Sequence, residues 1–325
     1  MRTAFLVSAL ALVFAMSLML GSTRLTGVEA IIALFARDAG SAGLIMTEIR
    51  LPRALLGLLV GGILGLAGAA LQGFLRNPLA EPGVTGVSGG AALAAVIALY
   101  SGFSEVSLLA LPVAGILGGA LAALFLVLLA GRGTDETTLI LAGVALNALA
   151  ASLTALMLSL SRDPQAALEI TFWLMGSLSD RSLVHVYLAA PFIVLGGILL
   201  LQTCSSLDGL SLGAEVACSL GVNPRRLRRL LIAGTALGVG AATAVTGMVA
   251  FVGLMAPHLV RPWVGHVPSR TLGASTWCGA MLVLFADILA RTFPAGSELK
   301  LGVVTSLLGA PFLLALILRR VQGDP

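Results

Sequence analysis

Apolar residues fill about ten long stretches of this chain, and short polar segments separate them. A bilayer core about 30 Å thick needs roughly 20 consecutive apolar residues for each helix that crosses it. Stretches near that length recur at approximately 4–21, 52–75, 89–101, 107–130, 138–160, 184–202, 230–250, 256–265, 271–292 and 302–318. The pattern predicts an all-α integral membrane protein in the lipid bilayer, with about ten transmembrane helices in a single domain, 1–325.

Composition supports a membrane protein and argues against an enzyme. Hydrophobic residues make up 58% of the chain and charged residues 10%, with a mean hydropathy of +1.05, whereas soluble domains carry about 25% charged residues. The chain has no G-x-x-x-x-G-K-[ST] phosphate loop, and its only lysine, Lys300, follows Leu299. We find no nucleophile or general-base constellation and no metal-ligand spacing. We therefore expect a transport pathway without a cofactor or a nucleic-acid partner, driven by energy from elsewhere.

The N-terminal apolar run has two interpretations. Arg2 followed by the run 4–20 resembles a secretory signal peptide. No A-x-A cleavage site follows, because the polar residues after position 20 lead straight into more apolar sequence. We favour a first transmembrane helix.

The distribution of basic residues predicts the orientation. With the N-terminus inside and ten crossings, eleven basic residues fall inside and eight outside. The arginines at 225–229 adjoin a span, and such clusters belong on the cytoplasmic side. We therefore expect both termini in the cytoplasm. The segment 205–229 would be a cytoplasmic excursion, with a short surface helix at 212–221 that closes on Gly221.

The second predicted span combines a packing face with a turn. Gly57, Gly61 and Gly65 repeat every fourth residue, the small-residue spacing that lets membrane helices approach closely. The span ends in the segment 76–83, which has two prolines and a glycine and therefore predicts a helix stop. Asn77 and Leu79 in this turn are candidates for closing a pore on the cytoplasmic side, and an ordinary turn is the alternative.

Two arginines begin the same span. Arg50 and Arg53 flank Pro52, which suits the first turn of a helix, and their spacing of three places them on one face. Two guanidiniums at the outer membrane edge can bind carboxylates bidentately. Docking of a partner is one interpretation, and anchoring of the helix at the lipid headgroups is the other.

Asp287 lies inside the apolar stretch 279–290. A carboxylate near the bilayer centre costs about 2.5–3.5 kcal/mol on insertion scales, so such residues usually face protein or water. Asp287 could carry a coupling proton, or it could pair with Arg291 four residues later. The i, i+4 spacing favours the ion pair.

Taken together, these motifs resemble one family, the FecCD-type permeases, which are the membrane subunits of type II ABC importers for iron-siderophores, haem and cobalamin. The resemblance runs nearly end to end. It rests on the segments 50–53, 72 with 76–86, 141–146, 173–178, 212–222, 251–258, 286–291 and 302–312.

The resemblance implies the assembly and the direction of transport. Two permease subunits would form the pathway at their interface in the bacterial inner membrane. We expect two copies of this chain, and a pair with a close paralogue is the alternative. Two cytoplasmic ATPase subunits would drive it, and a periplasmic substrate-binding protein would deliver a metal chelate. The chelate would pass from periplasm to cytoplasm.

The resemblance also assigns residues to roles. Docking of the binding protein is implied for Arg50, Arg53 and Arg291, and lining of the pathway for Asn147. The cytoplasmic gate would comprise Asn77, Leu79, Glu136 and Thr137. Coupling to the ATPase falls to the segment 212–221, with the positions Leu212, Gly213, Glu215, Ala217, Leu220 and Gly221.

The loop before the last helix departs from the family pattern, the gate position Glu136 is acidic here, and one other function stays open. Family members usually have proline where this chain has Lys300, before the last helix, which changes the outer loop. The alternative function is a proton-coupled secondary transporter that uses Asp287. Such a transporter would be expected to show inverted repeats, and we find no convincing repeat in the sequence. The identity of the chelate does not follow from the sequence.

Overall fold

The protein is described by a computed structural model over residues 2–21, 40–103, 107, 109–130, 136–161, 163–293 and 298–321. Within these ranges every regular element is a helix, and there is no strand. Among the described residues, seven helical stretches are long and apolar enough to cross a membrane. The predicted all-α membrane fold is confirmed.

The helices fall into a long set and a short set. The long set is α1 (Arg2–Met19), α4 (Leu51–Phe74), α5 (Val87–Tyr100), α7 (Ala110–Ala130), α8 (Glu136–Leu160), α10 (Leu183–Leu201), α13 (Pro224–Thr246), α14 (Val252–Val264), α15 (Pro268–Thr292) and α16 (Leu301–Val321). The short set is α3 (Gly40–Leu44), the π-helical η1 (Ile45–Arg50), the 3₁₀ turn η2 (Pro82–Thr85), α9 (Pro164–Leu174), α11 (Cys204–Ser211) and α12 (Ala214–Ser219). Each of the ten predicted spans falls on one helix of the long set.

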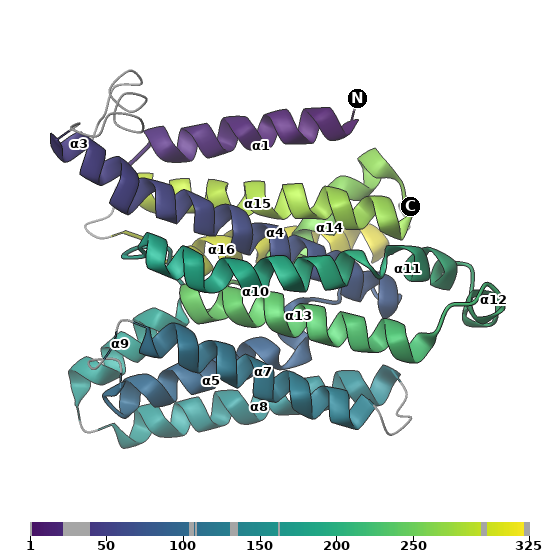
Figure 1. Cartoon of the computed structure of the whole chain (residues 1–325), viewed down its shortest axis with the longest axis horizontal. Helices are drawn as coiled ribbons and strands as arrows, with labels where there is room; N and C mark the ends of the chain where they lie inside the picture. The colour runs from purple at the N-terminus through teal and green to yellow at the C-terminus, as the bar shows by residue number, and fades with distance from the viewer. Residues whose placement is uncertain are drawn as a thin grey trace.

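The long helices lie side by side in a bundle (Figure 1). α1 lies along one edge and packs on α15, with Leu6 and Leu10 buried. α4 follows, between α15 and the pair α10 and α13, while α5, α7 and α8 pack together at the opposite edge. α1 therefore packs as a member of the bundle, as a first transmembrane helix would.

Glycines allow α4 and α15 to touch along their backbones. A methyl group on Gly61 would overlap the carbonyl oxygen of Gly279, and one on Gly65 would overlap that of Ser275. Gly68 approaches Gly253 at the start of α14 equally closely. The small-residue face predicted for the second span is thus the contact between α4 and its neighbours, as expected for close helix packing.

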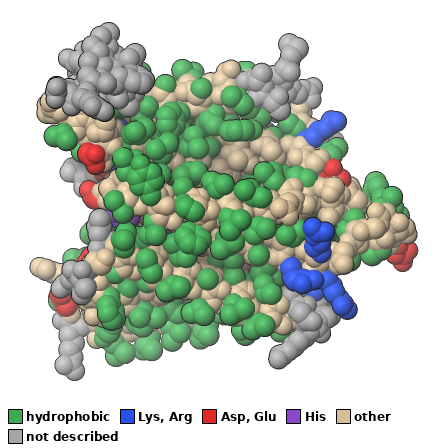
Figure 2. All heavy atoms as spheres, in the orientation of Figure 1, with side chains coloured by type: hydrophobic (Ala, Val, Ile, Leu, Met, Phe, Trp, Pro, Cys, Tyr) green, Lys and Arg blue, Asp and Glu red, His purple; other side chains and the backbone are tan. Residues whose placement is uncertain are grey.

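The bundle has two ends. The start of α4, the ends of α1 and α15 and the start of α16 meet at one end, which we call the arginine end. The end of α4, both short helices α11 and α12 and the start of α13 meet at the other, which we call the α12 end. Figure 2 shows hydrophobic side chains covering the face between the two ends, with basic side chains gathered toward the α12 end. An apolar band between two polar ends suits a protein surrounded by lipid.

α13 begins six residues earlier than the sequence pattern predicts. The pattern predicts a span from 230, but the helix starts at Pro224, so the arginines at 225–229 lie on its first turns. The Asn223 side-chain oxygen accepts hydrogen bonds from the Arg225 and Arg226 amides at 3.0 and 3.1 Å. An asparagine cap followed by proline is a helix-start signal. The predicted excursion 205–229 is therefore α11, α12 and the first turns of α13.

Candidate functional site

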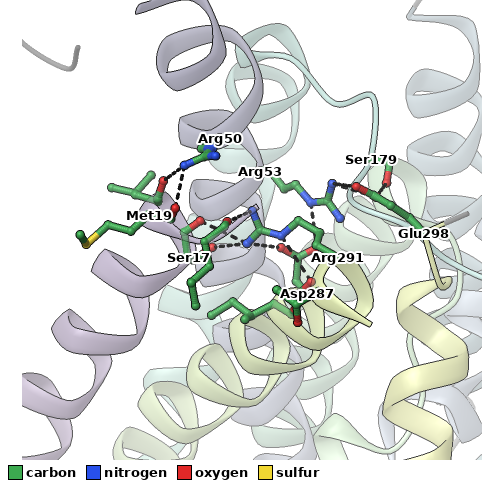
Figure 3. Close-up of polar contacts among 12 residues, drawn as sticks. Ser17, Met19, Arg50, Arg53, Ser179, Asp287, Arg291 and Glu298 are labelled. Atoms are coloured by element: carbon green, nitrogen blue, oxygen red, sulfur yellow. Dashed lines mark hydrogen bonds and ion pairs between the residues drawn. The ribbon is translucent and has the colours of Figure 1, made fainter. Parts of the chain in front are cut away.

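A cluster of mostly buried charged side chains lies at the arginine end. It consists of Arg50, Arg53, Asp287, Arg291 and Glu298, which we call the arginine cluster (Figure 3). Arg50 ends η1, Arg53 lies in the first turn of α4, and Asp287 and Arg291 lie in the last turns of α15. Glu298 belongs to the segment just before α16. Two regions that are more than 230 positions apart in sequence thus meet here.

Asp287 is held between two guanidiniums. Its Oδ1 accepts from Arg53 Nε at 2.8 Å, and its Oδ2 lies 3.0 Å from Arg291 Nη2. The Asp287 side chain is 1% exposed. A buried carboxylate is tolerated when its charge is compensated in this way. The ion pair with Arg291 predicted from the i, i+4 spacing is confirmed, and Arg53 is a second partner that the spacing could not reveal.

The end of α1 receives the other arginine donors. Arg50 Nη1 donates to the carbonyl oxygens of Leu18 and Met19 at 2.8 and 2.9 Å. Arg291 donates to the Ser17 hydroxyl at 2.9 Å and to the Leu20 carbonyl at 3.1 Å. The last carbonyls of a helix lack intrahelical partners and carry the negative end of its dipole. The arginines therefore fasten α1 to α4 and α15.

Glu298 lies on the solvent-exposed side of the arginine cluster. Its Oε2 accepts from Arg53 Nη1 at 3.1 Å and from the Ser179 hydroxyl, in the loop between α9 and α10, at 2.6 Å. Burial alone would raise the pKa of Glu298, but the Ser179 and Arg53 hydrogen bonds and the positive charge of Arg53 outweigh it and leave the pKa below its usual value. Glu298 is therefore negatively charged at neutral pH.

The three arginines assigned to docking are consequently turned into the protein. Arg50 is 3% exposed and Arg53 7% exposed, and Arg291 has a side-chain exposure of 5%. The sequence alone suggests guanidiniums displayed at a membrane edge. Their burial has a physical cause, because the α1 carbonyls, Asp287 and Glu298 offer partners that the sequence positions do not show.

Lys300, which replaces the proline usual in the family, lies beside the arginine cluster. Its ammonium group sits 5.1 Å from the centroid of the Phe172 ring on α9. A lysine over an aromatic face is attracted to the ring by a cation–π interaction. The lysine therefore links the start of α16 to α9.

The turn after α4 lies at the α12 end and contains Asn77 and Leu79. The Leu79 amide donates to the Asn77 side-chain oxygen at 3.0 Å. Both side chains line a cavity of about 850 Å³, counting its open mouth, between the end of α4, η2, α7 and α13. Glu81 and Arg228 are further polar residues of its lining. The structure thus places both predicted gate residues at an open cavity.

Hydrogen bonds connect this turn to α14 and to the residue before it. Gln72 Nε2 donates to the Ala80 carbonyl at 3.2 Å, and Gln72 Oε1 accepts from Arg261 at 2.6 Å. His258 Nε2 lies 2.9 Å from the Pro78 carbonyl oxygen. The Glu81 carboxylate accepts a hydrogen bond from the Phe251 amide just before α14. Displacement of α14 would therefore displace the turn.

The other residues predicted for the gate and the pathway lie on α8. The helix starts at Glu136, but the side chains of Glu136 and Thr137 lie outside the described part of the chain. Asn147 is half-buried, and its side-chain oxygen faces Gly89 of α5, where a methyl group would overlap it. Asn147 therefore lies at the contact between α5 and α8. The spacing of apolar residues along the chain could not predict this contact.

The residues predicted for coupling lie in α12 and directly on either side of it. Leu212 and Leu220 are 65% and 64% exposed, Glu215 is also exposed, and Ala217 is buried against the rest of the segment. Gly213 and Gly221 bound α12 at φ +116° and +84°, where a side chain would be strained. α12 projects from the bundle (Figure 1). The segment thus presents apolar side chains away from the core.

One contact that sequence reasoning missed connects α11 to the turn after α4. Arg76, immediately before Asn77, donates from Nη2 to the Leu210 carbonyl of α11 at 3.0 Å. On the other side, Asp208 of α11 accepts from the Ser269 amide at the start of α15 at 2.8 Å. Arg76 belongs to the motif that ends the second span, but nothing in the sequence shows which carbonyl it reaches.

Comparisons with known proteins cover nearly the whole chain. The model of the FecCD transport family matches residues 9–319. The haemin transport permease HmuU of Yersinia pestis is 39% identical over 281 residues, which are 85% of this chain and 84% of HmuU. The ferric enterobactin permease FepD of Escherichia coli is 36% identical over 312 residues, 95% of this chain and 92% of FepD.

The vitamin B12 permease BtuC of Vibrio cholerae and a solved structure agree. BtuC is 39% identical over 280 residues, 84% of this chain and 82% of BtuC. An inward-facing structure of a metal-chelate type ABC transporter superposes with a TM-score of 0.86 at 30% identity, covering 97% of each chain. A family match over almost the full length, supported by a shared fold, leads to one conclusion: this chain belongs to the FecCD transport family of ABC-importer permeases.

Proposed function

We propose that this chain is the membrane-spanning subunit through which an ABC importer moves an iron-siderophore, haem or cobalamin-type chelate from periplasm to cytoplasm. The observation that carries the proposal is the likeness, over 97% of the chain, to a metal-chelate type ABC transporter. HmuU, FepD and BtuC are named for haemin, ferric enterobactin and vitamin B12, and they support this class of substrate. The chain itself performs no catalysis, and ATP is hydrolysed on separate subunits.

The two ends of the bundle fit the two sides of the bacterial inner membrane. The arginines at 225–229 adjoin α13 at the α12 end, and basic clusters next to a span favour the cytoplasm. The first turn of α1 and the last turn of α16 lie at the same end. The α12 end would therefore be cytoplasmic, with both termini, and the arginine end would face the periplasm.

Partners bind at both ends. Two ATPase subunits would contact the exposed side chains of Leu212 and Leu220 together with Glu215, since an exposed apolar helix outside the bilayer fits a protein groove. The periplasmic binding protein would dock at the arginine end through Arg50, Arg53 and Arg291. A second copy of this chain would complete the pathway, which is lined in part by Asn147.

Coupling would proceed from α12 through α11 to the gate. A push on α12 displaces α11, and the hydrogen bond between Arg76 and Leu210 passes the displacement to the turn with Asn77 and Leu79. Together with Glu136 and Thr137 of α8, this turn would open and close the cytoplasmic exit. The proton-coupled alternative gains no support, because Asp287 is engaged by Arg53 and Arg291.

The Arg76 link gives a first prediction. Arg76→Ala should leave ATP hydrolysis by the assembled importer near the wild-type rate but lower chelate uptake roughly fivefold, because a charge-assisted hydrogen bond between α11 and the gate is lost. The measurement is uptake per ATP hydrolysed in proteoliposomes. Arg270→Ala, which removes an exposed arginine at the same end, is the control and should behave as wild type. An unchanged ratio for Arg76→Ala would contradict the link.

The substrate class is tested by a panel of chelates. Proteoliposomes with this chain, its ATPase and its binding protein would be offered a ferric siderophore, haem and a corrinoid, with ATP trapped on the ATPase side. We expect uptake of one of these classes. Uptake of none of them, with intact uptake of another solute, would contradict the proposed substrate class.

A further inference from the structure

We propose that Glu298 sets the affinity of the docking surface, because it occupies the part of Arg53 that a carboxylate of the binding protein would use. This inference rests on the proposed role of Arg50, Arg53 and Arg291 in docking. Glu298 would compete with the carboxylate of the binding protein for Arg53. Docking would therefore require displacement of Glu298 from Arg53.

The geometry of the Arg53 guanidinium carries the argument. A guanidinium binds a carboxylate most strongly through two parallel N–H groups, and it offers two such edges, Nε with Nη2 and Nη1 with Nη2. Asp287 engages Nε at 2.8 Å, and Glu298 engages Nη1 at 3.1 Å. Among the residues that the structure describes, none accepts from Nη2. Each edge thus has one nitrogen occupied, and an incoming carboxylate finds no free pair.

Only one of the two internal carboxylates is placed to leave. The Asp287 side chain is 1% exposed and is shared with Arg291, so its departure would leave charges buried without partners. The Glu298 side chain is 39% exposed and lies beside solvent, where water can hydrate it after it leaves. Displacement of Glu298 frees the Nη1–Nη2 edge while Asp287 keeps Arg53 in place.

Glu298 is held firmly enough to compete. The Ser179 hydroxyl donates to Oε2 at 2.6 Å, and the pKa of Glu298 lies below its usual value. The Ser179 amide donates in turn to the Ser177 hydroxyl oxygen at 3.0 Å, and the Ser177 amide donates to the Thr246 carbonyl at 2.7 Å. The loop that presents Ser179 is therefore anchored to the end of α13, and Figure 3 shows Ser179 and Arg53 on either side of Glu298.

An exchange of this kind weakens docking without abolishing it. The partner's carboxylate replaces Glu298 at Arg53, so the number of ion pairs stays constant while the attraction of Glu298 for Arg53 must first be overcome. The displaced Glu298 then remains beside the docked carboxylate and repels it. Both effects favour release of the binding protein after delivery.

The test is the affinity of the importer's purified binding protein for the complete importer in lipid nanodiscs. Glu298→Gln removes the competing charge and should lower Kd about fivefold, the scale of a partly exposed ion pair. Ser179→Ala loosens Glu298 and should lower Kd by a smaller factor. Asp180→Asn is the matched control, since it removes a neighbouring exposed charge at φ +58°, which asparagine tolerates. It should change Kd less than twofold.

The outcomes separate this inference from the docking proposal beneath it. Arg53→Lys keeps the positive charge but loses the two parallel N–H donors of the guanidinium, so it should weaken binding of the binding protein. Binding to the wild-type importer should also weaken as the salt concentration rises. If neither occurs, the docking role is wrong. If both occur but Glu298→Gln binds as wild type or more weakly, Glu298 is not a competitor and the inference is overturned. Thermal unfolding of each variant must match wild type within a few degrees, and Ser179→Ala provides the same test if Glu298→Gln fails to fold.

Discussion

Asp287→Ala should lower the free energy of unfolding by about 3–5 kcal/mol and abolish uptake. Removal of one partner from a buried ion pair leaves the other charge uncompensated, which typically costs this much. Here two guanidiniums would lose their carboxylate partner, because Asp287 lies 2.8 Å from Arg53 Nε and 3.0 Å from Arg291 Nη2. Both also hold neighbouring elements, since Arg291 reaches the end of α1 and Arg53 reaches Glu298. The measurement is unfolding of the detergent-solubilised protein, followed by tryptophan fluorescence.

Two further variants make this prediction specific. Asp287→Ala combined with Arg291→Ala should lose less stability than the sum of the single variants, because contacting residues couple in a double-mutant cycle. Glu169→Ala removes an exposed carboxylate on α9 and should unfold as wild type. Wild-type stability of Asp287→Ala would show that the arginine cluster does not hold α1, α4 and α15 together.

Gly65→Ala should destabilise the protein by roughly 1–3 kcal/mol, the usual cost of overpacking a core. The new methyl group would overlap the carbonyl oxygen of Ser275, a backbone atom that cannot rotate away. α4 and α15 would therefore have to separate along their line of contact. Alanine forms helices better than glycine, so helix propensity opposes this effect and any loss of stability reports the overlap.

The control is Gly273→Ala in α15, where a methyl group meets no atom within 4 Å. It should leave the midpoint of thermal unfolding unchanged or raise it slightly. A Gly65→Ala protein as stable as the Gly273→Ala protein would contradict the close contact between α4 and α15.

The helices of this fold were predictable from sequence because membrane spans depend on local composition. Each apolar stretch became one helix, and the repeat with Gly61 and Gly65 became the packing face of α4. The predicted start of α13 was wrong because the arginines at 225–229 look like a polar loop. The asparagine cap at 223 and Pro224 were the correct signals for a helix start.

Of the contacts in the arginine cluster, only the ion pair within one helix could be predicted. Asp287 and Arg291 lie four residues apart, so helix geometry brings them together. The burial of Arg50 and Arg53 depends on the end of α1 and on Glu298, 31 and more positions away in sequence. No local pattern encodes such contacts. The roles in docking, gating and coupling stay predictions.

The source of energy for transport tests the central claim most directly. Proteoliposomes with this chain, its ATPase and its binding protein would be supplied either with ATP on the ATPase side or with a proton gradient across the membrane. The account predicts chelate uptake that requires ATP, stops when the ATPase cannot hydrolyse it, and continues when a protonophore collapses the gradient. Uptake that ignores ATP and follows the proton gradient would contradict the account and return attention to Asp287.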